Sequence, residues 1–236
     1  MPQPQWAPPP SDLQLATGVV DVWRADLTAA GARERALLSA DERARTDRFV
    51  RTEDGERWAA ARGILRALLA RYARADPRAL RFEPGPHGKP ALAGERAVAA
   101  RADEIEPDRL RFNLSHSGDV ALYAVTLDRE LGVDIELPRR QVDAVAIARR
   151  VLGAAEAERL AALDPTERAR AFLRAWVRWE AILKCHGTGI GGADAPSTGA
   201  EPWVCELDPG PPGAAALAVD PGPCEVRRWQ WPAAGA

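Results

Sequence analysis

This chain of 236 residues has few cysteines, a small net charge and no long apolar run. These features argue against a disulfide-rich secreted protein, a nucleic-acid-binding protein and a membrane protein. The three cysteines, Cys185, Cys205 and Cys224, are odd in number and lack metal-ligand spacing, which indicates a reducing compartment. A formal net charge of −2 gives no electrostatic basis for binding nucleic acid. No apolar run reaches membrane-spanning length, and the proline-rich start lacks the charged and apolar regions of a signal peptide. We therefore expect a cytoplasmic protein that binds neither nucleic acid nor membrane.

The composition is that of a globular protein, with 46% hydrophobic and 28% charged residues. Arginine greatly outnumbers lysine, so local basic patches suited to bidentate phosphate contacts stay open as an interpretation. Residues 1–14 are rich in proline and are predicted to form a flexible tail. The rest mixes short strands with helices, which favours an α+β fold of two halves, 15–129 and 130–236.

Residues 131–136 combine an apolar and an acidic face. In a strand, Val133 and Ile135 point one way while Asp134 and Glu136 point the other. Carboxylate oxygens on a rigid element suit Mg²⁺, which usually takes one or two carboxylates together with substrate phosphates. The competing interpretation is a half-buried strand with a charged solvent face, and this segment taken alone favours that second interpretation.

Two helices are predicted in the first half of the chain. Ser39 followed by Glu42 is a capping-box pattern and starts a short helix with several basic positions. A longer helix is predicted over about 53–74, with an apolar stripe for the core and arginines on its other faces. These arginines form either a solvated face or a clamp for phosphate.

Polar residues gather at two further places before residue 120. Residues 85–90 contain two glycines and two prolines, which predicts a restrained loop that presents His87 and Lys89. Residues 112–118 predict a strand that ends in a tight loop carrying Ser115, His116 and Ser117, followed by an apolar strand. A hairpin is predicted over 120–136.

A long helix is predicted from the Asp164–Pro165 pair to about residue 185, because an N-cap residue followed by proline begins a helix. Trp176, Glu180 and Lys184 recur every four residues and so share one face. A Glu-to-Lys pair at that spacing is commonly a surface bridge worth about 0.3 kcal/mol, so the spacing alone does not establish a functional site.

Four segments in this order resemble the 4′-phosphopantetheinyl transferase superfamily, in the single-chain type associated with surfactin and siderophore synthesis: residues 88–90, 112–118, 132–136 and 176–184. The resemblance runs from about residue 38 to residue 191. It implies a pseudo-twofold monomer whose two α+β halves, each a small antiparallel sheet packed with helices, enclose coenzyme A at their interface. It also implies transfer of the 4′-phosphopantetheine arm of coenzyme A to a serine of an acyl or peptidyl carrier protein. The reaction would use Mg²⁺ and release adenosine 3′,5′-bisphosphate.

The resemblance implies roles for individual residues. Asp134, Glu136 and Glu180 would be the metal-binding carboxylates, and Glu180 and Lys184 would act in catalysis, with Lys184 facing the pyrophosphate. Glu156 stands where the family has a candidate base for the carrier serine. The residues implied for the nucleotide and its 3′-phosphate are Lys89, Ser115 and His116, with Arg43, Arg45 and Arg57 as further candidates.

One position departs from the family pattern, which has lysine directly before the helix glutamate, whereas this chain has Trp179. An indole cannot donate a charge-assisted hydrogen bond to phosphate, and the loss of one transition-state donor costs about 2.7–4 kcal/mol. Trp179 either stacks on a ligand or fills a gap in the core. The alternative function is therefore a coenzyme A- or carrier-binding paralogue with reduced or no transferase activity. A further alternative is a structural protein whose carboxylates form only salt bridges.

Overall fold

The computed structural model describes residues 6–85, 88–93, 105, 109–138, 142–188 and 201–233. The strands are β1 (Val19–Asp26), β2 (Phe82–Pro84), β3 (Pro90–Leu92), β4 (Leu110–Ser117), β5 (Val120–Leu127), β6 (Glu130–Glu136), β7 (Trp203–Leu207), β8 (Ala214–Asp220) and β9 (Glu225–Gln230). The helices are α1 (Ala32–Arg35), α2 (Ala40–Thr46), α3 (Thr52–Ala73), α4 (Ala144–Val151), α5 (Ala154–Ala161) and α6 (Pro165–His186). No helix among the described residues is long and apolar enough to cross a membrane.

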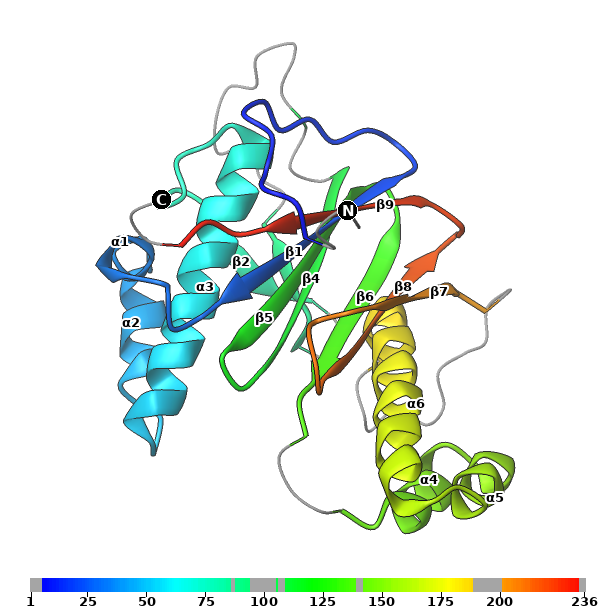
Figure 1. The fold of residues 1–236 in the computed structure, drawn as a ribbon. Helices are drawn as coiled ribbons and strands as arrows, with labels where there is room; N and C mark the ends of the chain where they lie inside the picture. The colour runs from blue at the N-terminus through cyan, green and yellow to red at the C-terminus, as the bar shows by residue number, and fades with distance from the viewer. Residues whose placement is uncertain are drawn as a thin grey trace.

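Two small β-sheets lie face to face, and one long helix covers the outer face of each (Figure 1). The first sheet has the order β4-β5-β1-β9, and its neighbours are antiparallel except for the parallel pair β1 and β9. The second sheet, β6-β8-β7, is wholly antiparallel. A separate two-stranded sheet pairs β2 with β3. This arrangement confirms the expected α+β fold with small, largely antiparallel sheets in two subdomains.

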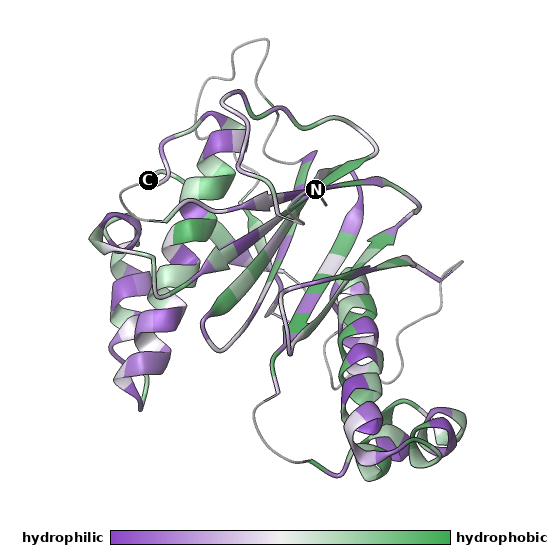
Figure 2. Ribbon diagram, in the orientation of Figure 1, coloured by the Kyte–Doolittle hydropathy of each residue, from purple (hydrophilic) through white to green (hydrophobic). Residues whose placement is uncertain are grey.

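Alternation along the strands divides the apolar side chains between the layers. Trp23 on β1 is fully buried against α3, while Val20 and Val22 face the second sheet. On β6, Val133 and Ile135 enter the core between the sheets, and the bands along this strand alternate in hydropathy (Figure 2). The opposite face of β6 therefore carries Gly132, Asp134 and Glu136 toward α6.

Local capping residues set the starts of two helices as the sequence predicted. Ser39 Oγ accepts a hydrogen bond from the Glu42 amide, and the Glu42 carboxylate accepts one from the Ser39 amide, which completes the capping box of α2. Asp164 accepts hydrogen bonds from the amides of Thr166 and Glu167, with Pro165 as the first residue of α6. Both signals act within one turn, so they do not depend on tertiary contacts.

Two local predictions were wrong. Ser115, His116 and Ser117 do not form a loop: they belong to β4, which pairs with β5 up to Ser117. The polar positions of β4 are tolerated inside the protein because their side chains are hydrogen-bonded to β6. The predicted hairpin over 120–136 is also absent, since β5 pairs with β1 and β4 whereas β6 pairs with β8.

The two ends of the described chain both contact the first sheet. Ala7 forms an isolated parallel bridge with Trp229 of β9, and the Trp6 indole donates a hydrogen bond to the carbonyl of Asp208. Of the predicted flexible tail, residues 6–14 thus include contacts with the C-terminal part of the chain, while residues 1–5 lie outside the described range. Because β9 completes the first sheet, the last strand of the second half crosses to the first half. The boundary at residue 129 stays a prediction.

Candidate functional site

Lys184, Asp134 and Ser115 form a hydrogen-bonded group between α6, β6 and β4. The Lys184 ammonium donates to Asp134 Oδ1 at 2.5 Å and to Ser115 Oγ at 3.0 Å, and Ser115 Oγ lies 2.8 Å from the same carboxylate oxygen. Asp134 is only 3% exposed, so its carboxylate is stabilised by these partners rather than by water. The structure therefore brings three of the predicted site residues, 115, 134 and 184, into direct contact.

Close packing of α6 on β6 makes this contact reachable. Gly132 has no side chain, and a Cβ atom there would collide with the carbonyl oxygen of Ala181 and the amide nitrogen of Cys185. The glycine lets the helix backbone approach the strand, which brings Lys184 over Asp134 two residues further along β6. The glycine at position 132 is thus required by packing and not by a turn.

Two further carboxylates, Glu136 and Glu180, belong to the same region. Glu136 Oε2 accepts a hydrogen bond of 2.9 Å from the Ser117 hydroxyl. Burial raises the pKa of Glu180, the negative charge of Asp134 raises it further, Lys184 opposes the rise, and Glu136 adds to it. The pKa of Glu180 therefore lies above that of an ordinary glutamate, because burial and two neighbouring carboxylates disfavour its charged form.

The donor set of this region fits a hard cation such as Mg²⁺, although the side chains do not converge on one point. Among the described residues, no three His, Cys, Asp or Glu side chains lie close enough to hold a metal ion as they stand. Asp134 Oδ2 is buried and has no hydrogen-bond partner, which leaves one carboxylate oxygen free for a cation. Together with the raised pKa of Glu180, this orphaned oxygen indicates an oxygen-only site that a cation would complete.

A cavity of about 650 Å³ opens beside Lys184 and is otherwise lined by residues between 41 and 116. Its volume is in the range of small-molecule sites. The wall is formed by α2, α3, β2, the start of β3 with Gly88 before it, β4 and the end of α6. Its polar side chains are Asp41, Glu42, Arg45, Arg62, Glu83, Ser115, His116 and Lys184. Two aromatic rings in this wall carry guanidinium groups: Arg45 lies 5.1 Å from the Trp58 ring centroid and Arg62 lies 3.8 Å from that of Phe82. Such a surface suits a ligand that combines a flat ring with phosphates.

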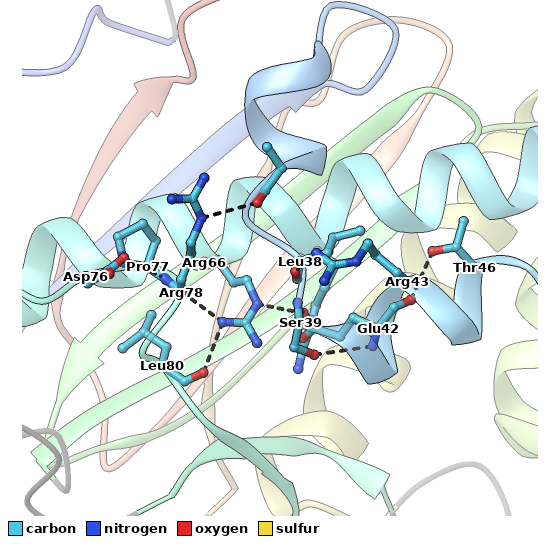
Figure 3. A network of polar contacts seen from close by, with 12 residues as sticks. Leu38, Ser39, Glu42, Arg43, Thr46, Arg66, Asp76, Pro77, Arg78 and Leu80 are labelled. Carbon is cyan, nitrogen blue, oxygen red and sulfur yellow. Dashed lines mark hydrogen bonds and ion pairs between the residues drawn. The ribbon is translucent and has the colours of Figure 1, made fainter.

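The acidic wall residue Glu42 is neutralised by a buried network (Figure 3). Arg66 Nε donates to Glu42 Oε2 at 2.6 Å, and Arg66 also donates to the carbonyls of Pro77 and Leu80. Arg62 donates to the other oxygen of Glu42. Burial would raise the pKa of Glu42, but the hydrogen bonds from Arg66, the Ser39 amide and Arg62 outweigh it and lower the pKa. Glu42 is therefore an anion that fixes two arginines and ties α2 to α3.

Of the residues predicted for a nucleotide, the structure brings Arg45, Ser115 and His116 to the cavity wall and places the others elsewhere. Lys89 donates to Glu130 and to the carbonyl of Leu131 at the start of β6. Three other predicted site residues lie away from the cavity wall. Arg43 donates to the carbonyl of Leu38, Arg57 pairs with Asp119, and Glu156 on α5 pairs with Arg159. The hydrogen bond from Arg159 lowers the pKa of Glu156.

Trp179 is half-buried on α6 beside Glu180, with its ring centroid 5.3 Å from that of Trp176. Trp176 in turn lies 5.9 Å from Phe172, so the three rings form a row along the helix. The neighbouring Arg178 is 3.7 Å from Glu206 on β7 and does not replace a cation at position 179. Trp179 thus has packing on one side and exposed surface on the other.

Residues that sequence reasoning missed include Trp58 and Arg62 in the cavity wall and Ser117 beside Glu136. Trp58 and Arg62 lie four residues apart on α3, and that spacing was the available signal for a shared face. The signal for Ser117 was the alternation of polar residues at 113, 115 and 117, which matches a strand as well as a loop.

Comparison with known proteins gives matches over both halves. A family model described as the 4′-phosphopantetheinyl transferase superfamily matches residues 130–232, and one described as 4′-phosphopantetheinyl transferase, N-terminal, matches residues 23–127. The chain is 36% identical over 191 residues to the 4′-phosphopantetheinyl transferase HetI of Nostoc sp., covering 80% of this chain and 77% of that protein. It is 33% identical over 132 residues to the transferase AcpT of Escherichia coli, covering 56% of this chain and 58% of the relative. A 4′-phosphopantetheinyl transferase of Bacillus subtilis is 29% identical over 164 residues, covering 69% of this chain and 66% of that protein.

Proposed function

Because the chain belongs to the 4′-phosphopantetheinyl transferase superfamily, we propose that it transfers the 4′-phosphopantetheine arm of coenzyme A to a serine of an acyl or peptidyl carrier protein. The proposed reaction depends on Mg²⁺ and releases adenosine 3′,5′-bisphosphate. The observation that carries the proposal is the contact of Lys184 with the buried Asp134 at the edge of the cavity. This contact joins the cavity proposed for the phosphates of coenzyme A to one of the carboxylates proposed for Mg²⁺.

We assign binding of the nucleotide part of coenzyme A to the cavity. Arg45 lines it over Trp58 and Arg62 lines it over Phe82, with His116 also in the wall, so phosphate donors and flat apolar surfaces both face the cavity. Guanidinium groups donate in a planar fork that matches phosphate oxygens. Because Arg62 is already held by Glu42, little conformational entropy is lost when a ligand binds it.

We assign the pyrophosphate of coenzyme A, where the reaction takes place, to the region of the three carboxylates on β6 and α6. Asp134, Glu136 and Glu180 would hold Mg²⁺, which would neutralise charge on the pyrophosphate when bound. The carrier serine oxygen forms a bond to the phosphorus that carries the pantetheine arm, and the bond from that phosphorus to the leaving nucleotide phosphate breaks. Lys184 stabilises the charge that develops on the leaving phosphate, since its ammonium lies at the cavity wall.

The serine must lose a proton, and Glu156 is the family's candidate acceptor for it. In this structure Glu156 is held by Arg159 at 2.6 Å and its pKa is lowered, so it is a weaker base than an ordinary glutamate. Burial and the charges of Asp134 and Glu136 raise the pKa of Glu180, and a bound cation would offset these charges. We therefore keep Glu180 among the cation ligands, leave Glu156 out of the reacting group, and assign the serine proton to solvent water.

The direct test is mass spectrometry of apo-carrier proteins after incubation with the chain, coenzyme A and Mg²⁺. We expect added phosphopantetheine on at least one of several acyl and peptidyl carriers, and no addition with the Asp134→Ala variant. A variant that transfers as well as the wild type would assign the carboxylates to salt bridges alone. Unmodified carriers throughout, with the wild-type chain folded, would refute the proposed activity.

The second candidate function is binding of coenzyme A or a carrier protein with little or no transfer, and Trp179 is the observation that favours it. Calorimetry of coenzyme A binding, combined with the carrier assay, distinguishes this second function from the transferase. Coenzyme A binding without turnover would support the paralogue, whereas binding with turnover supports the transferase.

A further inference from the structure

Three polar side chains of β4 connect the two sheets along a seam with β6. The Asn113 side-chain oxygen accepts a hydrogen bond from the Val133 amide at 2.9 Å. The next two inward positions, Ser115 and Ser117, donate to Asp134 at 2.8 Å and to Glu136 at 2.9 Å. Because β4 and β6 belong to different sheets, these side chains replace the backbone ladder that would otherwise align them. The seam therefore sets the position of β6 and of its two carboxylates together.

Ser117 differs from Ser115 in that the cavity does not reach it. It is fully buried, and it is absent from the residues that line the cavity, whereas Ser115 lines the wall and contacts Lys184. The Ser117 oxygen accepts a hydrogen bond of 3.0 Å from the Leu137 amide. With that acceptor position occupied, the hydroxyl proton is directed to Glu136 Oε2. The geometry leaves this serine no evident role in contacting a substrate.

We propose that Ser117 is a positioning residue for cation binding, which holds the Glu136 carboxylate in place through Oε2. Among the described residues, the other oxygen, Oε1, receives no hydrogen bond and is left to serve as a ligand. A glutamate side chain loses substantial rotamer freedom when it is fixed, and Ser117 fixes it before a cation arrives. The proposal rests on the proposed Mg²⁺ dependence and assigns to the chain a residue that controls cation affinity.

The expected loss of cation affinity can be estimated from other proteins in which a hydrogen bond to a metal ligand was removed. Removal of such a partner lowers metal affinity by about 10–100-fold. Ser117→Ala should therefore raise the dissociation constant for Mn²⁺, used as a probe for Mg²⁺, by about tenfold or more. The maximal transfer rate at saturating Mg²⁺ should change much less than the Mg²⁺ concentration needed to reach it.

The chain offers a matched control in Thr126 on β5. Thr126 is fully buried, and its hydroxyl donates to the carbonyl of Val19 at 2.7 Å, outside the site. Thr126→Val removes one buried hydroxyl at constant shape, so it should cost stability without changing Mn²⁺ affinity. Ser117→Cys keeps the shape of serine but donates poorly, and should give an intermediate affinity even where the alanine variant folds badly.

The experiment measures Mn²⁺ binding by calorimetry and electron paramagnetic resonance on the full chain without coenzyme A, with thermal unfolding of each variant alongside. Weaker binding in both Ser117 variants with unchanged binding in Thr126→Val is the expected result. The inference would be overturned if Ser117→Cys bound Mn²⁺ as tightly as the wild type, or if Thr126→Val lost as much Mn²⁺ affinity as the Ser117 variants. It would also be overturned if the wild type bound no Mn²⁺. Because binding is read without turnover, weaker binding in an inactive chain would uphold this inference while the proposed transfer fails.

Discussion

Lys184 Nζ lies 2.5 Å from Asp134 Oδ1, and this ion pair joins the last turns of α6 to the middle of β6. The two side chains differ in their access to water: that of Asp134 is 4% exposed and that of Lys184 is 27% exposed. The carboxylate is therefore the partner that depends on the pair, since the ammonium can still be hydrated.

Lys184→Met should destabilise the fold as well as abolish transfer, because it leaves the Asp134 carboxylate buried without a cation. We expect a loss of about 3 kcal/mol in the free energy of unfolding, measured by urea denaturation at neutral pH. Lys89→Met is the matched control, as Lys89 is the only other lysine of the chain and pairs with the exposed Glu130. That control should lose about 1 kcal/mol or less, and equal losses in both variants would contradict the prediction.

Glu180→Gln should have the opposite effect on stability. The pKa of Glu180 is raised in the folded chain, so the ionised carboxylate disfavours folding at neutral pH and the penalty disappears when it is protonated. The variant should unfold at a higher temperature than the wild type at pH 7. The difference should shrink as the pH falls through the raised pKa toward the ordinary value of 4.5.

The same variant should transfer no phosphopantetheine, so stability and activity would move in opposite directions. A scan of melting temperature against pH in metal-free buffer, combined with the carrier assay, checks both parts. A variant that melts below the wild type at pH 7 would show that Glu180 is a stabilising residue instead.

The sequence predicted those features that short segments determine. The capping box of Ser39 and Glu42, the N-cap at Asp164 and the alternation of 131–136 all depend on neighbours within a few residues. The shared face of Glu180 and Lys184 follows from helical geometry in the same way. These local rules predict which residues share one face of a strand or helix, but the contact of Lys184 with Asp134 between two elements is visible only in the structure.

Features that depend on distant partners could not be predicted. The polar residues of β4 resemble a loop because their hydrogen-bond acceptors lie on β6, and nothing local reveals that pairing. The hairpin over 120–136 failed because β6 pairs with β8, whose strand begins only at Ala214. The direction in which the side chains of Lys89 and Arg57 point could not be predicted from the sequence either. Both form ion pairs away from the cavity wall, Lys89 with Glu130 and Arg57 with Asp119.

Glu42→Gln should loosen both α2 and the cavity wall, because the carboxylate holds Arg62 and Arg66 at once. A buried charge-assisted hydrogen bond contributes about 1.5–3 kcal/mol, and we expect a loss of stability of that size at pH 7. The pKa of Glu42 is lowered in the folded chain, so its contribution is present above the ordinary pKa of 4.5 and is lost as the pH falls through the folded pKa.

Weaker coenzyme A binding should accompany the loss in Glu42→Gln, since Arg62 is no longer fixed over Phe82. Calorimetry and urea denaturation measure the two effects. Glu56→Gln serves as the control because its pair with Arg35, at 3.8 Å, is exposed on both sides. Unchanged coenzyme A affinity in Glu42→Gln would show that the network supports the helices alone.

Glu156→Gln should leave the transfer rate within about twofold of the wild type, well below the effect of removing a general base, which is about 10²-fold or more. Its carboxylate is occupied by Arg159 and its pKa is lowered, so it is a weak proton acceptor. Steady-state kinetics with a carrier protein as the varied substrate check this. A fall of 10²-fold would restore Glu156 as the base, as the family resemblance implied.

Trp179→Lys tests whether the departure from the family pattern limits the reaction. A lysine there would add a cation next to Glu180, and a donor of this kind contributes up to about 10²–10³-fold in rate when it meets charge in the transition state. Trp179→Met is the matched control, because it removes the indole from its contact with Trp176 and adds no charge. A faster turnover in the lysine variant than in the methionine variant would show that the wild type lacks this donor. Equal rates in the two variants would mean that Lys184 and the bound cation already supply the stabilisation, and Trp179 would then be assigned to packing along α6.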